Sequence, residues 1–224
     1  MANPLHVAAW EPPDASPALT VIAVHGRGSN EEDLLGLGRS LGLPVRVIAP
    51  RGPLTLPLGW TTGYAWYHFA ETGQPEPASF RQSLDLLAAL VEDVKGRYAL
   101  RPEALVLLGF SQGAVMSLAA ALTVPGSIGG VAALSGYFPR PDGWEAPHRD
   151  LRGLPVLVTH GTYDDILPVE WGREAAETLR DRNARVRYEE FPMAHQVNPD
   201  CLRTVSEWLK ERAQAAGGPG MGAT

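Results

Sequence analysis

The sequence predicts one α/β domain built on a doubly wound, mostly parallel β-sheet that is flanked by helices, with no large separate lid domain. Two observations lead to this fold class. Apolar, β-branched runs alternate along the chain with segments of helical period, and one apolar run leads through a glycine-rich turn straight into a helix. The 224 residues suit a single domain, which we place at residues 1–215, and residues 216–224 are expected to form a flexible tail.

The glycine-rich turn lies within residues 104–123, ALVLLGFSQGAVMSLAAALT. The apolar residues before Gly109 show no alternation, which predicts a buried strand, and the Ala- and Leu-rich residues after Gly113 predict a buried helix. A G-x-S-x-G pentapeptide between a strand and a helix is the signature of a nucleophile elbow. Its glycines remove Cβ atoms where strand and helix crowd the turn, so Ser111 can be held in a strained, exposed conformation. The alternative, an incidental serine in a glycine-rich turn, is disfavoured by the strand and helix on either side.

The other elements follow from hydrophobic period and capping signals. Strands are predicted at 5–10, 19–24, 45–49, 128–134, 154–159 and 185–191, and helices after Asn30 and at 79–98, 169–182 and 200–214. Asn30 can cap the first helix, and Ser79 with Gln82 fits a capping box for the second. Residues 50–77 show no convincing period and are expected to form a long loop, in which residues 60–69 hold five of the chain's 17 aromatics.

Composition argues against several classes of protein. The net charge of −6, with scattered basic residues, gives no basic footprint for nucleic acid. No run approaches the ~20 apolar residues of a membrane span, and MANPLHVAAW lacks the basic region and apolar core of a signal peptide. The single cysteine, Cys201, excludes an internal disulfide and fits a reducing compartment, so we expect a cytoplasmic protein. No His or Cys cluster predicts a metal site.

A serine hydroxyl is a weak nucleophile at neutral pH and needs an adjacent base that an acid holds in place. In folds that carry this elbow the chain order is Ser, then Asp or Glu, then His, and the ligand crevice lies beyond the carboxyl ends of the strands. His195 follows the predicted strand at 185–191 and is therefore the expected base. The acid is expected after the preceding strand, where Asp164 and Asp165 are both candidates, and spacing alone favours neither.

Acyl transfer also needs donors for the developing oxyanion. The residue after the nucleophile supplies one and the loop after an early strand the other, so we assign the backbone N–H groups of Gln112 and Arg27. The Arg27 side chain is expected to pair with an acid at 31–33, and a grip on an anionic substrate group is the alternative. His25 and His160 each precede a glycine at a strand end and are expected to be packed, hydrogen-bonded histidines rather than ligands.

These segments together resemble the phospholipase/carboxylesterase family of α/β hydrolases, which includes small carboxylesterases and acyl-protein thioesterases. The matching pieces run in order over nearly the whole domain: HGRGSNEEDLL at 25–35, AWYHF at 65–69, LGFSQGAVMSL at 108–118, ALSGYFP at 133–139, HGTYDDILPV at 160–169 and MAHQV at 193–197. The resemblance implies an α/β-hydrolase fold with Ser111 as nucleophile, His195 as base and Asp164 as acid. It also implies oxyanion donors at Arg27 and Gln112, and hydrolysis of esters or thioesters of acyl chains without a cofactor.

The substrate side of the site is less defined by the sequence. AWYHF carries His68 where family members often have an acid, which leaves acyl-chain and headgroup preference open. The residues that we expect to line the substrate pocket are Trp60, Trp66, Tyr67, Tyr137 and Leu167. Ordinary packing under the long loop is an equal alternative for the aromatics at 60–69. An exposed apolar rim would serve either substrate access or contact in a homodimer.

The leading hypothesis is a serine carboxylesterase that cleaves small or acyl-chain esters through an acyl-enzyme. Acyl-protein thioesterase or lysophospholipase-type activity is the main alternative. A peptidase or a lactone hydrolase on the same fold is a further one, although lactone-cleaving relatives tend to use Cys at the elbow, where this chain has Ser111. A non-catalytic binding module would be signalled by a missing triad member, and all three members are present in the sequence.

Overall fold

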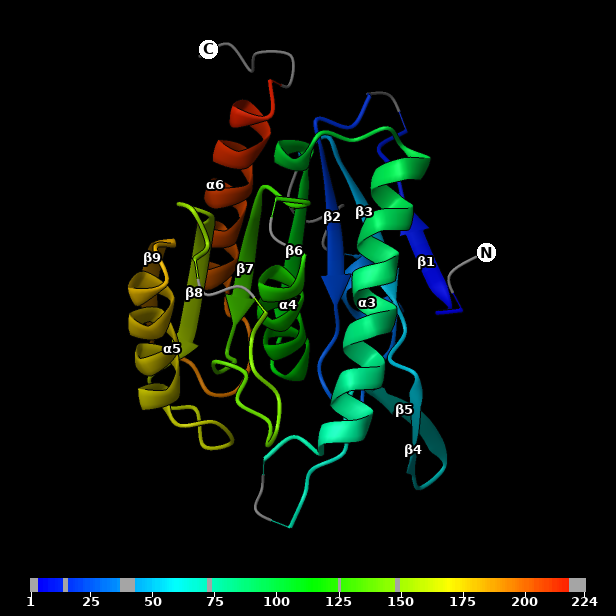
Figure 1. Cartoon of the computed structure of the whole chain (residues 1–224), viewed down its shortest axis with the longest axis vertical. Helices are drawn as coiled ribbons and strands as arrows, with labels where there is room; N and C mark the ends of the chain where they lie inside the picture. Colours follow the sequence, from blue (N-terminus) through cyan, green and yellow to red (C-terminus); the bar gives the residue numbers. More distant parts are fainter. Residues whose placement is uncertain are drawn as a thin grey trace.

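The computed structural model describes residues 4–13, 16–36, 43–71, 74–124, 126–147 and 150–217. Within them, seven strands form one sheet in the order β1-β3-β2-β6-β7-β8-β9 (Figure 1). These strands are β1 (Val7–Trp10), β2 (Leu19–Val24), β3 (Val45–Pro50), β6 (Leu105–Phe110), β7 (Gly130–Leu134), β8 (Pro155–Gly161) and β9 (Arg185–Phe191). β1 runs antiparallel to β3, and every other pair of neighbours is parallel. The predicted mostly parallel sheet is therefore confirmed.

Helices cover both faces of the sheet. They are α1 (Glu32–Leu35), α3 (Pro77–Arg97), α4 (Gln112–Thr123), α5 (Val169–Asp181) and α6 (Pro199–Ala215), with a 3₁₀ turn η1 (Pro102–Ala104) before β6. α3, α4 and α5 pack on one face, and α1 and α6 pack on the other (Figure 1). Because both faces are covered, β2 is buried at every residue, which explains its nearly continuous apolar sequence. Of the predicted tail, only Ala216 and Gly217 lie within the described residues.

The turn between β6 and α4 brings three backbone segments together. Ser111 has φ 54° and ψ −120°, in the positive-φ region that residues with side chains rarely adopt. A Cβ on Gly109 would collide with the Gly113 carbonyl group, and a Cβ on Gly113 would collide with the Val24 carbonyl group at the end of β2. Glycine at both positions therefore lets α4 begin directly against the two strands.

Residues 50–77, predicted as a loop, contain a β-hairpin. Its strands β4 (Leu54–Leu58) and β5 (Thr61–Ala65) form a separate antiparallel sheet near the end of the molecule toward which β2 points (Figure 1). The Gly28 N–H donates to the Tyr64 carbonyl oxygen at 2.7 Å and ties the hairpin to the loop after β2. The loop prediction was wrong because prolines interrupt the hydrophobic period, and a two-stranded sheet has only edge strands, where proline is tolerated.

The start of α3 also differs from the prediction. The helix begins at Pro77, and the carboxylate of Glu76 accepts the N–H groups of Ala78 (2.9 Å) and Ser79 (2.8 Å) as the N-cap. The Ser79 hydroxyl and these N–H groups lower the pKa of Glu76 to about 2. The predicted capping box of Ser79 and Gln82 is therefore wrong, because Ser79 already lies inside the first turn.

The close approach at Gly113 gives a test of the fold. Gly113→Ala forces a methyl group against the Val24 carbonyl group, so we expect the free energy of unfolding to fall by about 3 kcal/mol or more. Gly96→Ala in α3 is the matched control, because its Cβ would meet nothing within 4 Å. There the free energy of unfolding should stay level or rise by about 0.5–1 kcal/mol. Denaturant titrations followed by circular dichroism measure both, and equal effects would contradict this description of the elbow.

Candidate active site

Three side chains meet beyond the carboxyl ends of the strands. Ser111 follows β6, Asp164 follows β8 and His195 follows β9. His195 Nε2 lies 2.9 Å from Ser111 Oγ, and His195 Nδ1 lies 2.7 Å from Asp164 Oδ2. The structure therefore brings the serine, the acid and the histidine of the sequence analysis into one hydrogen-bonded chain.

Asp164 has a buried side chain in an exposed turn, and the backbone of this turn stabilises its ionised form. Its side chain has no exposed surface, and Oδ1 accepts the N–H groups of Ile166 (3.0 Å) and Leu167 (2.8 Å). Burial alone raises the pKa of this carboxyl group, but the Leu167 N–H and the His195 ring outweigh burial and keep the pKa below its ordinary value. Asp165, which spacing left as an equal candidate, is exposed. Asp164 is the acid that contacts His195.

A second histidine touches Asp164. His160 Nε2 lies 3.5 Å from Asp164 Oδ2 and 2.8 Å from the Leu167 carbonyl oxygen, which can only accept, so Nε2 carries a proton. The ring is fully buried, and burial lowers its pKa. Gly172 lets α5 pass close to the ring, because a Cβ there would lie 2.5 Å from His160 Nδ1. His160 is packed and hydrogen-bonded as expected, but its contact with Asp164 was not foreseen.

The loop after β2 lies beside the elbow and is held there by a buried histidine. A Cβ on Gly26 would sit 3.4 Å from Ser111 Cβ. His25 Nδ1 donates to the Gly26 carbonyl oxygen (2.7 Å), and its Nε2 accepts the Gly52 N–H (2.9 Å). Burial lowers the pKa of His25. A neutral ring thus fastens the loop that carries Arg27.

Two backbone N–H groups beside the elbow are candidates for binding an oxyanion. Arg27 follows Gly26, and its N–H donates to no backbone acceptor within the described part of the chain. Gln112 is the first residue of α4, where N–H groups have no partner inside the helix. Both N–H groups therefore suit the oxyanion role that the sequence analysis assigned to them.

The side chain of Gln112 has a second function that the sequence analysis missed. Its Oε1 accepts the Trp66 N–H at 2.8 Å, and its Nε2 donates to the Tyr67 carbonyl oxygen at 2.8 Å. The Trp66 indole N–H in turn donates to the His25 carbonyl oxygen at 3.0 Å. The elbow, the segment after β5 and the loop after β2 are thereby joined through buried hydrogen bonds. The motif pointed only to the backbone of Gln112, and nothing in the sequence marks its side chain.

The five residues expected to line the substrate pocket lie in different environments. Trp66 and Tyr67 have no exposed surface, so the expectation that they form an open pocket wall is wrong, and both belong to the core. The hydroxyl groups of Tyr137 and Tyr67 share a hydrogen bond of 2.9 Å. Tyr137 also lines a small cavity of about 170 Å³ together with Trp171. Trp60 lies at the hairpin turn and is fully exposed. Leu167 lies near Asp164 and is half-buried.

The Arg27 side chain does not pair with the acids at 31–33. Its guanidinium carbon lies 5.9 Å from the ring centre of Phe69, a cation–π contact. Glu31 is taken by Arg51, whose guanidinium group binds both carboxylate oxygens. The exposed Arg27 head therefore remains on the rim of the site.

A doubly wound sheet with a serine elbow after β6 and a histidine loop after its last strand defines an α/β hydrolase. The chain belongs to the Phospholipase/Carboxylesterase family, whose model matches residues 6–212. The resemblance seen in the sequence motifs is thus confirmed, and with it the fold class.

Individual relatives agree with this assignment. The chain is similar to acyl-protein thioesterase 1 of Candida albicans, with 24% identity over 215 residues that cover 88% of this chain and 93% of that protein. It is similar to carboxylesterase SOBER1 of Arabidopsis thaliana, with 26% identity over 175 residues, or 75% of this chain and 76% of that protein. Among solved structures, esterase PE8 has a TM-score of 0.76 and 27% identity, and the match covers 92% of this chain and 98% of that one.

The helices give one further fact about the chain. Within the described residues, none is both long and apolar enough to cross a membrane.

The side chain of Gln112 gives a test of how the site is held together. Gln112→Leu leaves the Trp66 N–H and the Tyr67 carbonyl group buried without a partner, so we expect the free energy of unfolding to fall by about 2–4 kcal/mol. Gln82→Leu, on the exposed side of α3, is the matched control and should change it by less than about 0.5 kcal/mol. Urea unfolding of both variants checks the prediction. A Gln112 variant as stable as the control would show that these bonds are unimportant.

Proposed function

We propose that this protein is a serine hydrolase that cleaves carboxylic esters of acyl chains through an acyl-enzyme. The main support is the hydrogen-bonded chain from Ser111 Oγ through His195 to the buried Asp164 carboxylate, set on a strained turn beyond the carboxyl ends of the strands. Membership of the family supports hydrolysis, since its named relatives include carboxylesterases and thioesterases.

The proposed reaction has two halves. In acylation, Ser111 Oγ attacks the ester carbonyl carbon while His195 Nε2 takes its proton, and Asp164 stabilises the charged imidazole. The oxyanion of the tetrahedral intermediate accepts the N–H groups of Arg27 and Gln112. The bond to the alcohol oxygen then breaks as His195 returns the proton to it. In deacylation, water attacks the acyl carbon while His195 Nε2 takes its proton. The bond to Ser111 Oγ then breaks as His195 returns this proton to Oγ, and the carboxylic acid leaves and ionises to a carboxylate and a proton in solution.

Exposed apolar side chains around the site favour acyl chains as substrates. Ile166, two residues from Asp164, is 63% exposed, Phe69 beside Arg27 is 48% exposed, and Leu58 near the loop after β2 is 47% exposed. Apolar surface on the segments that flank the site suits a fatty acyl group better than a small polar ester. Thioester hydrolysis is the second candidate function, because the same residues serve an acyl-sulfur bond and relatives such as that of Candida albicans are named acyl-protein thioesterases.

The first measurement is the hydrolysis rate on p-nitrophenyl esters of increasing acyl length and on the matching thioesters. We expect Ser111→Ala to lower kcat/KM by about 10⁴-fold or more, because the nucleophile is lost. Ser117→Ala, which removes a buried hydroxyl group from the same helix, is the control and should act like the wild type. Activity that survives in Ser111→Ala would overturn the proposal. A short-chain optimum would contradict acyl-chain specificity, and a wild type inactive on every substrate would favour a binding module.

The identity of the acid is tested by two neighbouring substitutions. Asp164→Asn removes the charge that faces His195 and is expected to lower kcat by about 10⁴-fold. Asp165→Asn removes an equal charge from the exposed next residue, and we expect kcat within about twofold of the wild type. Steady-state kinetics on the best ester measure both values. Equal losses in the two variants would show that Asp164 has no special role.

A further inference from the structure

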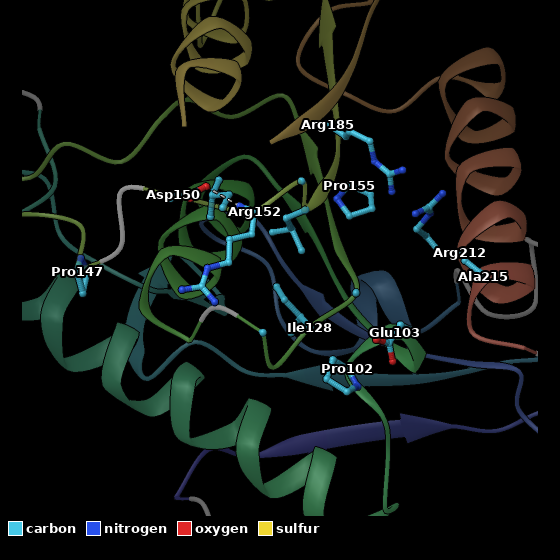
Figure 2. A pocket seen from close by; sticks show the side chains of 15 residues that line it. Pro102, Glu103, Ile128, Pro147, Asp150, Arg152, Pro155, Arg185, Arg212 and Ala215 are labelled. Atoms are coloured by element: carbon cyan, nitrogen blue, oxygen red, sulfur yellow. Dashed lines mark hydrogen bonds between the residues drawn. The ribbon is translucent and has the colours of Figure 1, made fainter. Parts of the chain in front are cut away.

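A cleft of about 950 Å³ opens near the amino ends of β8 and β9 (Figure 2). Its walls come from η1, from the residues before β7, from the loop that leads into β8, from the first residues of β8 and β9, and from the last turns of α6. The parallel strands run from this cleft toward the site, so the seven residues of β8 separate the two by about 20 Å. A molecule in the cleft therefore does not contact Ser111. The volume lies within the range of about 300–1,000 Å³ that small-molecule sites usually have.

Three arginine side chains line the cleft: Arg152, Arg185 and Arg212. In Figure 2 the guanidinium groups of Arg185, at the start of β9, and Arg212, on α6, point toward one another across the gap between these elements. Burial lowers the pKa of Arg212, Glu211 partly offsets this effect, and the charge of Arg185 lowers the pKa further. Two like charges are thus held face to face in a concave surface, an arrangement that an anion between them would stabilise.

The hydrogen-bonding capacity of Arg212 is only partly used. Its side chain is 15% exposed, and its buried Nε has no hydrogen-bond partner. Among the described residues it forms one ion pair, from Nη2 to Glu211 Oε2 at 3.7 Å, and Glu211 also lies 3.7 Å from Arg187. A buried N–H group without an acceptor is costly, and a ligand oxygen would satisfy it.

Within the described residues, the carboxylates that line the cleft form no ion pair with Arg185 or Arg212. Asp150 accepts hydrogen bonds from the backbone N–H of Arg152 at 2.9 Å and from the side-chain amide of Asn183 at 3.2 Å, so its carboxylate stabilises the local turn. Glu103 is exposed, and within the described residues it makes no ion pair with an arginine of the cleft. Between the charged ends, the floor is apolar, with Ile128 and Leu151 both buried.

We propose that this cleft is a second ligand site, which binds a small amphiphilic anion with a carboxylate or phosphate headgroup between Arg185 and Arg212. The planar guanidinium fork matches the paired oxygens of both headgroups. The apolar body of the ligand lies against Ile128 and Leu151. The site is independent of the proposed ester hydrolysis, because it shares no residue with the chain of Ser111, Asp164 and His195.

Calorimetric titration of the whole protein with octanoate, octyl phosphate, inorganic phosphate and uncharged octanol tests the site. We expect octanoate or octyl phosphate to bind, and the one with the lower Kd identifies the headgroup. Octanol should bind at least about tenfold more weakly than that anion. Arg185→Gln should raise the Kd of the bound anion by about tenfold, because one charged contact is lost. This side chain is exposed, so the fold should survive the substitution, and thermal unfolding checks it.

Two further variants separate the cleft from other sites. Arg212→Gln should weaken anion binding at least as much as Arg185→Gln, because both face the same headgroup. Arg203→Gln removes an exposed arginine that pairs with Asp200 at the other end of α6, and the Kd should not change. Anion binding that is equal in the wild type and both cleft variants places the ligand elsewhere and overturns the proposal, as does the absence of binding at millimolar concentration.

Discussion

The close approach of the first turn of α4 to β2 and β6 is the constraint on which the rest of the site depends. Because Gly109 and Gly113 have no Cβ, the helix starts directly against both strands, and Ser111 is left at positive φ beyond the end of β6. The strain at such a residue is of order 1–3 kcal/mol, and it is balanced here by the packing of α4, which is buried along nearly its whole length. The first turn of this helix also sets the direction of the Gln112 N–H, so the proposed nucleophile and the proposed oxyanion donor are positioned by one contact.

Buried polar side chains then fasten the loops around this fixed point. His25 ties the loop after β2 to Gly52, Gln112 ties the elbow to the segment after β5, and His160 ties the turn of Asp164 to Leu167. Each such bond adds only about 1 kcal/mol net, but leaving its groups unpaired in the interior would cost more. The loops of the site are thereby limited to conformations that keep these bonds. This explains why neutral histidines lie so near to the candidate base without sharing its role.

The sequence predicted the serine, the acid and the histidine because parallel strands place their carboxyl ends at one edge, so chain order alone brings strand-end residues together. Spacing could not separate Asp164 from Asp165, since only the path of the turn decides which carboxylate is buried against His195, and the choice of Asp164 came from the family resemblance of residues 160–169. The burial of Trp66 was equally hidden, because an aromatic-rich loop has the same composition whether its rings face solvent or core. The side-chain contacts of Gln112 depend on segments far apart in the chain, and such pairings leave no local pattern to detect.

The hydrogen bonds of the site join residues that are far apart in the sequence. His195 is 84 residues from Ser111 and 31 from Asp164, and both contacts require β9 to be in place beside β8 at one end of the strand order. Loop closure over such distances costs entropy before any contact is gained, so these contacts form late in folding. A chain still emerging from the ribosome can therefore hold a finished elbow without its histidine, and under the proposed mechanism it is expected to be inactive until β9 docks. Recovery of activity during refolding would report that final docking step, whereas helix content would report the earlier ones.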